Sequence, residues 1–295
     1  MLDYNMPLWR PPSEGNNLII QATLGCSFNR CSYCDMYRTK EYVARPLDDV
    51  FADIDQAAQA WPQAHRVFLA DGDALVRETD DLLAILSHLR ARLPDLQRVT
   101  SYALPANLIN KSVDELTRLR EAGLTLLYYG VESGSDEILK RITKGATQDV
   151  MVEGLEKARA AGMKISATVI LGLGGVGRSD AHIDGTAELI NRFAPNYLST
   201  LQLGLVPSRR ADFIARFERH GGTFEEQDDA GMLAEQTRLI ELLAPSRPVI
   251  FRSNHASNSL PLAGVLPKDK APLLEVLALA RTGMVQLRTP QQRGL

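Results

Sequence analysis

Residues 17–35 read Asn17-Leu-Ile-Ile-Gln-Ala-Thr-Leu24 and then Gly25-Cys-Ser-Phe-Asn-Arg-Cys-Ser-Tyr-Cys-Asp35. The first part is an apolar run with β-branched residues, which predicts a strand. Directly after it come Cys26, Cys31 and Cys34, the only cysteines among the 295 residues. A strand that runs straight into a cysteine loop therefore begins both the predicted fold and the candidate site.

Three thiols so close together suggest a metal or cluster site. Thiolates are the ligands of iron–sulfur clusters, and a [4Fe–4S] cluster has four iron corners. Three local cysteines fill three corners and leave one iron open to a small molecule. Two other interpretations stay open at this point: cysteines buried as small apolar residues, or three of four zinc ligands completed by a histidine. The five histidines, however, are scattered singly: His65, His88, His182, His220 and His255.

Composition and charge exclude several classes of protein. The chain is 45% hydrophobic and 23% charged, which is ordinary for a globular protein. Its formal net charge of −3 shows no excess of basic residues of the kind that binds nucleic acid. No apolar run reaches the length of a membrane span. The odd cysteine count and the absence of a signal-peptide pattern argue against a disulfide framework. We therefore expect a cytoplasmic protein with neither a membrane nor a nucleic acid as its primary partner.

Short β-rich runs alternate with amphipathic stretches along the chain, which is typical of βα units around a parallel sheet. A capping box at Ser112–Glu115 is expected to open one of the helices. The predicted strands cover 17–24, 66–70, 99–103, 124–131, 164–171, 197–205 and 248–251. The predicted helices cover 47–61, 79–93, 112–123, 147–161, 180–193, 230–243 and 269–281.

Six βα units followed by a seventh, edge strand predict an α/β fold, a partial (β/α)6 TIM-like barrel with a small C-terminal extension. We expect an N-terminal leader (1–16), the core barrel (17–205) and an extension (206–295) made of a helix, an edge strand, a polar loop and a helix. Ligands of parallel β/α folds bind at the carboxyl ends of the strands. Every unusual loop of the chain follows such an end: the cysteine loop, Asp71–Asp73, Glu132 and Gly172–Gly175.

At this point the sequence resembles the radical S-adenosylmethionine (SAM) superfamily. The cysteine loop is similar to that family's three-cysteine motif, with Tyr33 just before the last cysteine. Four residues, Ser27 to Arg30, separate the first two cysteines where the family usually has three. The run from Gly130 to Gly145 closely resembles the branch that contains oxygen-independent coproporphyrinogen oxidase, the methylthiotransferases and the Elongator catalytic subunit. The resemblance implies a single-cluster member of unassigned substrate.

The resemblance also implies two cofactors, a [4Fe–4S] cluster and SAM, and a set of residues that contact them. Cys26, Cys31 and Cys34 would bind the cluster. Asp71-Gly72-Asp73 stands where the family has Gly-Gly-Glu, so Asp73 would be the acid that holds the methionine ammonium. The remaining cofactor contacts implied by the family are Tyr33 beside the cluster, Glu132 at the ribose, Lys144 at the methionine carboxylate, and the backbone of Ile170 and Gly172 along the adenine.

By the same resemblance the protein is an enzyme that cleaves SAM reductively to a 5′-deoxyadenosyl radical, which abstracts hydrogen from a small-molecule or cofactor-like substrate. A one-electron donor such as flavodoxin or ferredoxin would be its partner. All three cysteines are used by one cluster, so we expect no auxiliary cluster with cysteine ligands. The alternative is a non-catalytic iron–sulfur electron carrier or redox sensor on the same fold.

A second polar segment, Phe251–Asn258, follows the last predicted strand. We predict that Arg252, Asn254, His255 and Asn258 lie on the substrate side of the catalytic site. A guanidinium binds a carboxylate or phosphate by two hydrogen bonds, and a histidine can transfer a proton near neutral pH. The alternative is a structural loop in which the backbone satisfies His255.

Overall fold

The computed structural model describes residues 2–293 of the chain, which divides into two compact units. Its main sheet has eight strands, with β1, β4, β5 and most of β6 in the first unit and most of β7 with β8, β9 and β10 in the second. The first unit comprises the described part of Met1–Asn29 with Cys34–Tyr129 and Glu153–Ile165, and the second comprises Arg30–Tyr33, Gly130–Val152 and the described part of Ser166–Leu295.

The strands of the first unit are parallel and lie in the order β1, β4, β5, β6. Gln21 pairs with Ala70, so the ends of β1 and β4 are level. All four residues of β1 are buried, as expected for parallel strands covered on both faces. The bounds are β1 Leu18–Gln21, β4 Arg66–Ala70, β5 Arg98–Ala103 and β6 Leu124–Glu132, while β2 Thr23–Leu24 and β3 Val43–Ala44 form a separate antiparallel ribbon.

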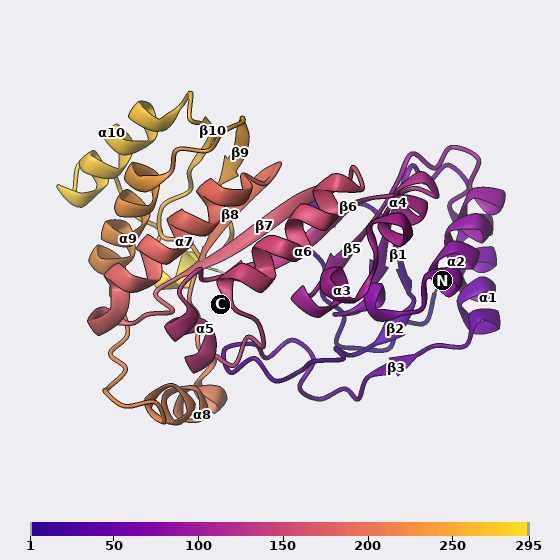
Figure 1. Ribbon diagram of the computed structural model, residues 1–295, viewed down its shortest axis with the longest axis horizontal. Helices are drawn as coiled ribbons and strands as arrows, with labels where there is room; N and C mark the ends of the chain where they lie inside the picture. The colour runs from indigo at the N-terminus through magenta and orange to yellow at the C-terminus, as the bar shows by residue number, and fades with distance from the viewer. Residues whose placement is uncertain (1, 294–295) are drawn as a thin grey trace. The chain divides into compact units, whose positions relative to one another are not determined.

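The helices of the first unit present apolar stripes with helical spacing. Val50, Ile54 and Ala57 are the buried face of α1, which packs beside α2 (Figure 1). The predicted capping box is confirmed, because Ser112 Oγ accepts from the Glu115 N–H at 3.1 Å and Glu115 accepts from the Ser112 N–H at 2.8 Å. The bounds are α1 Leu47–Ala60, α2 Thr79–Arg92, α3 Pro105–Asn110, α4 Val113–Glu121 and α6 Gln148–Ala160, with 3-10 turns at Pro12–Glu14 and Ala74–Val76. The start of α6, up to Val152, belongs to the second unit.

In the second unit, β7, β8 and β9 are parallel and β10 is antiparallel to β9. Helix α9 packs against both α7 and α10 (Figure 1). The strands are β7 Lys164–Leu171, β8 Tyr197–Gln202, β9 Val249–Arg252 and β10 Ala263–Leu266. The helices are α5 Asp136–Arg141, α7 Ser179–Phe193, α8 Pro207–Glu218, α9 Asp229–Leu242 and α10 Lys270–Arg281, with 3-10 turns at Val176–Arg178 and Pro290–Gln292.

The predicted α/β fold with parallel strands is confirmed, with several corrections. The predicted strand at 17–24 is broken at Ala22 into β1 and β2, and β2 pairs with β3 outside the main sheet. The last predicted strand, β9, is not an edge strand, because β10 pairs with it. The predicted strand at 197–205 ends at Gln202, and α8 begins soon after, with Pro207 in its first turn and Phe213 and Phe217 buried. Helices α3 and α5 were also not predicted. The division into leader, core barrel and extension stays a prediction.

Candidate cluster and cofactor site

The three cysteines lie between β2 and β3 in a loop without helix or strand, and each is half-buried. Among residues 2–293, the structure brings no three His, Cys, Asp or Glu side chains into an arrangement that could hold a metal ion. The donor set itself fits an iron–sulfur cluster, because three thiols within nine residues are the ligands that such clusters take. Tyr33, predicted beside the cluster, is also half-buried in this loop.

Two residues that sequence reasoning missed hold the loop within the first unit. Arg38 donates from Nε to the carbonyl of Cys34 at 3.0 Å and from its Nη1 to the carbonyl of Asn29. Asn29 donates from its side chain to the Tyr37 carbonyl at 2.9 Å, and its N–H points to Cys26 Sγ at 3.5 Å. The signal for this role was weak, since an Arg and an Asn near cysteines are common in any polar loop.

The Asp71–Gly72–Asp73 turn follows β4 and lies directly against the start of the cysteine loop. The Gly72 N–H donates to the Gly25 carbonyl at 3.1 Å. A Cβ on Gly72 would lie 2.7 Å from the Tyr37 ring and 3.1 Å from Cys26 Cβ. Gly72 is therefore required by this close approach, and the structure brings the two predicted motifs together.

Asp71 is a fully buried carboxylate with several partners. It accepts from Lys40 Nζ at 2.7 Å, from the Gly25 N–H at 3.0 Å and from Gln21 Nε2 at 3.2 Å. Lys40 also donates to the Asn5 carbonyl at 2.6 Å. Asp71 thus ties β1, the first residues of the cysteine loop and the N-terminal segment together.

Asp73 differs from Asp71, although it is equally buried. Ser27 donates to its Oδ2, while Oδ1 has no hydrogen-bond partner within the described part of the chain. Burial raises the pKa of Asp73 to about 6, against the opposing effects of Ser27, Asn107, the Val76 N–H and Lys111. None of these groups lies in hydrogen-bond geometry with Oδ1. A buried acceptor without a donor is costly, so this oxygen suits an incoming cationic donor such as an ammonium group.

In the second unit, Glu132 and Lys144 form a buried pair at 3.3 Å rather than a surface one. Glu132 Oε2 has no hydrogen-bond partner among residues 2–293. A Cβ on Gly130 would lie 2.0 Å from Glu132 Oε1 and 3.0 Å from Lys144 Nζ, so only glycine leaves room for the pair. The structure thus brings together the two residues predicted at the ribose and the methionine carboxylate.

The end of β7 carries the predicted adenine contacts. Gly172 adopts a φ of +84°, and a Cβ there would lie 2.4 Å from Met232 Cε. Its N–H donates to Glu235 Oε2 at 2.6 Å. The Ile170 carbonyl, two residues earlier in β7, accepts from His182 Nε2 at 3.0 Å. Both positions are therefore fixed by side chains from later helices, Glu235 from α9 and His182 from α7.

Glu235 and His182 were missed by sequence reasoning. Glu235 also accepts from Ser179 at 2.8 Å and from Gln227 at 3.3 Å, and burial raises its pKa. Both residues stand on the buried stripe of their helix, between apolar neighbours. A charged or titratable residue on such a stripe is the signal that could have identified them.

The predicted substrate-side residues lie at the end of β9, which Arg252 ends, and in the loop that follows it. Arg252 and Asn254 are exposed, and Arg252 Nη1 donates to the carbonyls of Phe251 and Gly264 at 2.7 and 3.3 Å. Half-buried His255 accepts the Ser257 N–H at Nδ1, at 3.1 Å, and burial lowers its pKa.

Asn258 turns inward from the same loop and is buried. Its amide nitrogen donates to the Thr200 carbonyl at 2.7 Å and to Ser253 at 2.8 Å. Its amide oxygen accepts from the Gln202 N–H at 2.8 Å and from Ser257 at 3.1 Å. Asn258 therefore anchors the loop to β8.

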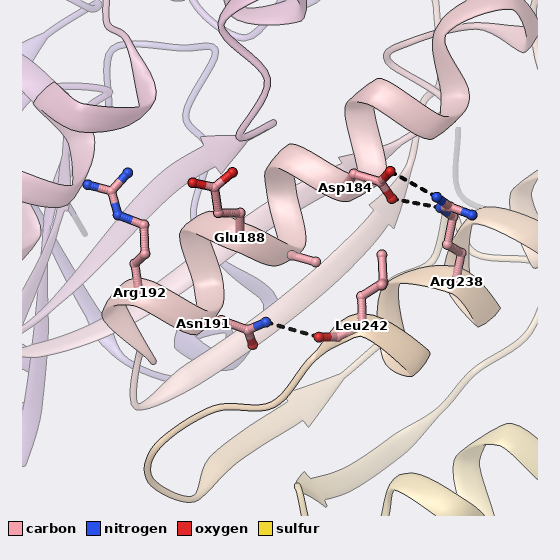
Figure 2. Close-up of a pocket in the computed structure, with 7 residues that line it drawn as sticks. Asp184, Glu188, Asn191, Arg192, Arg238 and Leu242 are labelled. Carbon is pink, nitrogen blue, oxygen red and sulfur yellow. Dashed lines mark hydrogen bonds and ion pairs between the residues drawn. The ribbon is translucent and has the colours of Figure 1, made fainter.

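Figure 2 shows a surface groove between α7 and α9 that is separate from all of these residues. Arg238 donates to both oxygens of Asp184 at 2.7 and 2.8 Å, and Asn191 donates to the Leu242 carbonyl at 2.9 Å. None of the predicted site residues lines this groove.

Among the described helices, none is both long enough and apolar enough to cross a membrane.

Comparison with known proteins defines the class. A sequence profile described as "Radical SAM superfamily" matches residues 20–190, more than half of the chain. The chain therefore belongs to the radical SAM superfamily, a family of enzymes whose cofactors are a [4Fe–4S] cluster and SAM. The predicted resemblance is confirmed at this level.

Individual relatives are more distant. The tRNA-2-methylthio-N(6)-dimethylallyladenosine synthase of Psychrobacter sp. (strain PRwf-1) is 28% identical over 241 residues, which cover 78% of this chain and 45% of that protein. The heme chaperone HemW of Bacillus subtilis (strain 168) is 26% identical over 153 residues, which cover 49% of this chain and 40% of that protein. The chain thus spans less than half the length of these curated relatives.

Among solved structures, coproporphyrinogen III oxidase (HemN) of Escherichia coli matches with a TM-score of 0.57 and 16% identity, over 76% of this chain and 51% of that one. At this identity the match concerns the fold alone. It agrees with the predicted TIM-barrel-like architecture.

Proposed function

We propose that the protein cleaves SAM reductively and uses the resulting 5′-deoxyadenosyl radical to abstract hydrogen from a substrate. The observation that carries the proposal is the packing of the Asp71–Asp73 turn on the cysteine loop, with one oxygen of buried Asp73 left unpaired. Membership of the radical SAM superfamily supports the same chemistry.

The proposed roles of the protein groups follow from their chemistry. Cys26, Cys31 and Cys34 would hold three irons of the cluster, which when bound supplies the electron for cleavage of the SAM sulfonium. Asp73 would accept a hydrogen bond from the methionine ammonium, which favours its ionised form over the protonated form that burial favours. The backbone of Asp71 and Gly72 would join Asp73 in holding the methionine ammonium, while the hydrogen-bonded Asp71 carboxylate would keep this turn in place.

Further residues would bind the other parts of SAM. Lys144 would meet the methionine carboxylate, and the unpaired oxygen of Glu132 would accept a ribose hydroxyl. The backbone of Ile170 and Gly172 would lie along the adenine.

The direct test is anaerobic reconstitution with iron and sulfide, followed by SAM and dithionite. We expect 5′-deoxyadenosine from the native protein, and loss of both bound iron and product when Cys26, Cys31 and Cys34 are each changed to Ser. Arg30→Ala, an exposed change in the same loop, is the matched control and should keep both. A protein with an intact cluster and no 5′-deoxyadenosine would instead be an electron carrier or redox sensor.

Substrate and partners are part of the proposal. A small-molecule or cofactor-like substrate would contact Arg252 and His255, and a donor such as flavodoxin or ferredoxin would supply the electron. A reducing cytoplasm suits thiols that hold a cluster. Arg252→Ala and His255→Ala should keep substrate-free SAM cleavage and lose its acceleration by a small-molecule cell extract; retained acceleration in both variants would contradict this role.

A further inference from the structure

The buried face of helix α7 contains two polar residues. His182 and Thr186 are both fully buried, although their neighbours on that face, such as Ile183 and Ile190, are apolar. Buried polar groups of this kind need partners. The partners of His182 and Thr186 lie at the ends of two strands that carry proposed SAM contacts.

The hydrogen bonds of His182 show which of its ring nitrogens carries the hydrogen. Nε2 lies 3.0 Å from the Ile170 carbonyl, which only accepts hydrogen bonds, so Nε2 carries the hydrogen. Nδ1 lies 2.8 Å from Ser133 Oγ and therefore accepts from that hydroxyl. Burial lowers the pKa of His182 to about 4, so the ring is neutral near pH 7. A neutral imidazole thus links the end of β7 to the residue after Glu132.

The turn that His182 holds is strained. Glu132 has a φ of +63°, and the Ser133 N–H donates to the Val131 carbonyl at 2.8 Å. This is a three-residue γ-turn with positive φ, which is rare for a residue with a side chain. Such conformations persist only where surrounding contacts impose them.

Helix α7 supplies those contacts. Thr186 Oγ1 accepts from the Gly134 N–H at 2.9 Å. A Cβ on Gly134 would lie 2.1 Å from the Gly185 carbonyl, so the backbone of the turn packs directly on the backbone of α7. The His182–Ser133 bond is the side-chain link from α7 to the residue that follows Glu132.

We propose that His182 is a positioning residue for the adenosine half of SAM, holding the Glu132 turn and the Ile170 backbone in one fixed arrangement. The inference rests on the proposed function, because it takes from it the ribose contact of Glu132 and the adenine contact of the β7 backbone. His182 itself would not touch SAM. Its effect is on the binding of the nucleoside, and the methionine side is served by Asp73 and Lys144.

The experiment uses the full chain with its cluster and measures binding of S-adenosylhomocysteine by anaerobic calorimetry. We expect His182→Phe, which fills the space without hydrogen bonds, to weaken binding at least about tenfold. His182→Asn should recover part of the affinity, because its amide oxygen takes the place of Nδ1 and accepts from Ser133. His88→Gln is the matched control, since His88 packs on Phe51 and Asp55 in the first unit.

Further readouts separate positioning from general destabilisation. Bound iron per chain and SAM turnover at saturation should stay near the native values in His182→Asn, while KM for SAM rises. Ser133→Ala is the milder variant for the case in which His182→Phe does not fold, and it should weaken binding in the same direction. In the His182→Phe background, Ser133→Ala should cost nothing more, because both residues act through one bond. The ¹⁵N shifts of His182 should show an Nε2–H ring that does not titrate between about pH 6 and pH 8.

Native-like binding by both His182→Phe and Ser133→Ala would overturn the inference while leaving the proposed function intact. Affinity losses that scale only with loss of melting temperature would also overturn it. A native protein that binds no S-adenosylhomocysteine would overturn the proposed function and this inference together. Binding that depends on His182 in a protein that forms no 5′-deoxyadenosine would support the inference and refute the proposed catalysis.

Discussion

Each unit contains a buried lysine–carboxylate pair, and the two pairs differ in how completely they are satisfied. In the first unit, Lys40 meets Asp71 at 2.7 Å, and Asp71 also accepts from Gly25 and Gln21. In the second, Lys144 meets Glu132 at 3.3 Å, and one Glu132 oxygen has no hydrogen-bond partner within the described chain. The carboxylate of the first pair has its hydrogen-bond partners without a ligand, whereas the carboxylate of the second keeps one oxygen that can accept a hydrogen bond from a ligand. Two buried ion pairs of the same type therefore differ: the carboxylate of one is fully hydrogen-bonded within the fold, and the carboxylate of the other keeps an acceptor for the ligand that we propose.

Asp73 shows that this difference is local. It lies two residues from Asp71 in the same turn, yet one of its oxygens also has no hydrogen-bond partner among the described residues. Of the two acids in the turn, Asp71 is the structural one and Asp73 is the one with a vacant acceptor. Measurements of stability and of ligand affinity should therefore separate these carboxylates.

The largest effect is expected from Lys40→Met, which leaves Asp71 buried without its cation. Removal of one partner of a buried pair costs about 3–5 kcal/mol of unfolding free energy. Urea denaturation checks this against Lys268→Met, an exposed lysine that should change stability little. A loss below about 1 kcal/mol would mean that the Asp71 network does not stabilise the fold.

Asp73 should make the unliganded protein less stable at neutral pH. Its pKa of about 6 in the folded chain lies above the ordinary 3.8, so folding favours the protonated form. The resulting stabilisation is fully present below about pH 4 and is lost as the pH rises through about 6, with a total of about 3 kcal/mol. Asp73→Asn should remove this dependence, which urea midpoints at about pH 4 and pH 7 would reveal. Parallel pH profiles for both proteins would contradict the prediction.

Lys144→Met should lower the unfolding free energy by about 1–3 kcal/mol, less than Lys40→Met. The nitrogen–oxygen distance of its pair is longer, and the Glu132 carboxylate lacks one hydrogen bond already in the native protein. Its larger effect should be on ligand binding, with weaker affinity for S-adenosylhomocysteine. Lys140→Met is the control, because Lys140 is exposed on the short helix α5, which ends three residues before Lys144. If Lys144→Met lost more stability than Lys40→Met, the contrast between the pairs would be reversed.

The smallest effect is expected from Arg238→Ala at the groove of Figure 2. The side chains of Arg238 and Asp184 both reach the solvent, and such surface pairs contribute little to stability. The loss should shrink further at high salt, because ions screen exposed charges. A cost as large as that of Lys144→Met would show that burial does not decide the strength of these pairs.

Much of the fold was predictable because its signals are local. The strands at 66–70 and 164–171 begin and end where the apolar runs do, and the Ser112–Glu115 capping box marks a helix start within four residues. Strand β10 was missed because Ala263–Leu266 contains Gly264 and is mostly accessible, so its state depends on pairing with β9. Helix α8 was missed although Phe213 and Phe217 show the helical spacing.

The candidate site divides in the same way. The cysteines and the Asp71–Asp73 turn were found because each motif is continuous in sequence. Glu235 lies 63 residues from Gly172, and His182 lies 49 residues from Ser133. Their roles arise from tertiary contacts, which a single sequence does not encode locally.

The hydrogen bond from Gly172 to Glu235 has a practical consequence for protein engineering. Residues 20–190, the part matched by the family profile, do not include α9. A chimera that grafted only this segment onto a new C-terminal half would leave the amide at the end of β7 without its acceptor. Any exchange of the region after residue 205 must therefore bring a substitute carboxylate, so the segment that matches the family profile cannot be transferred on its own.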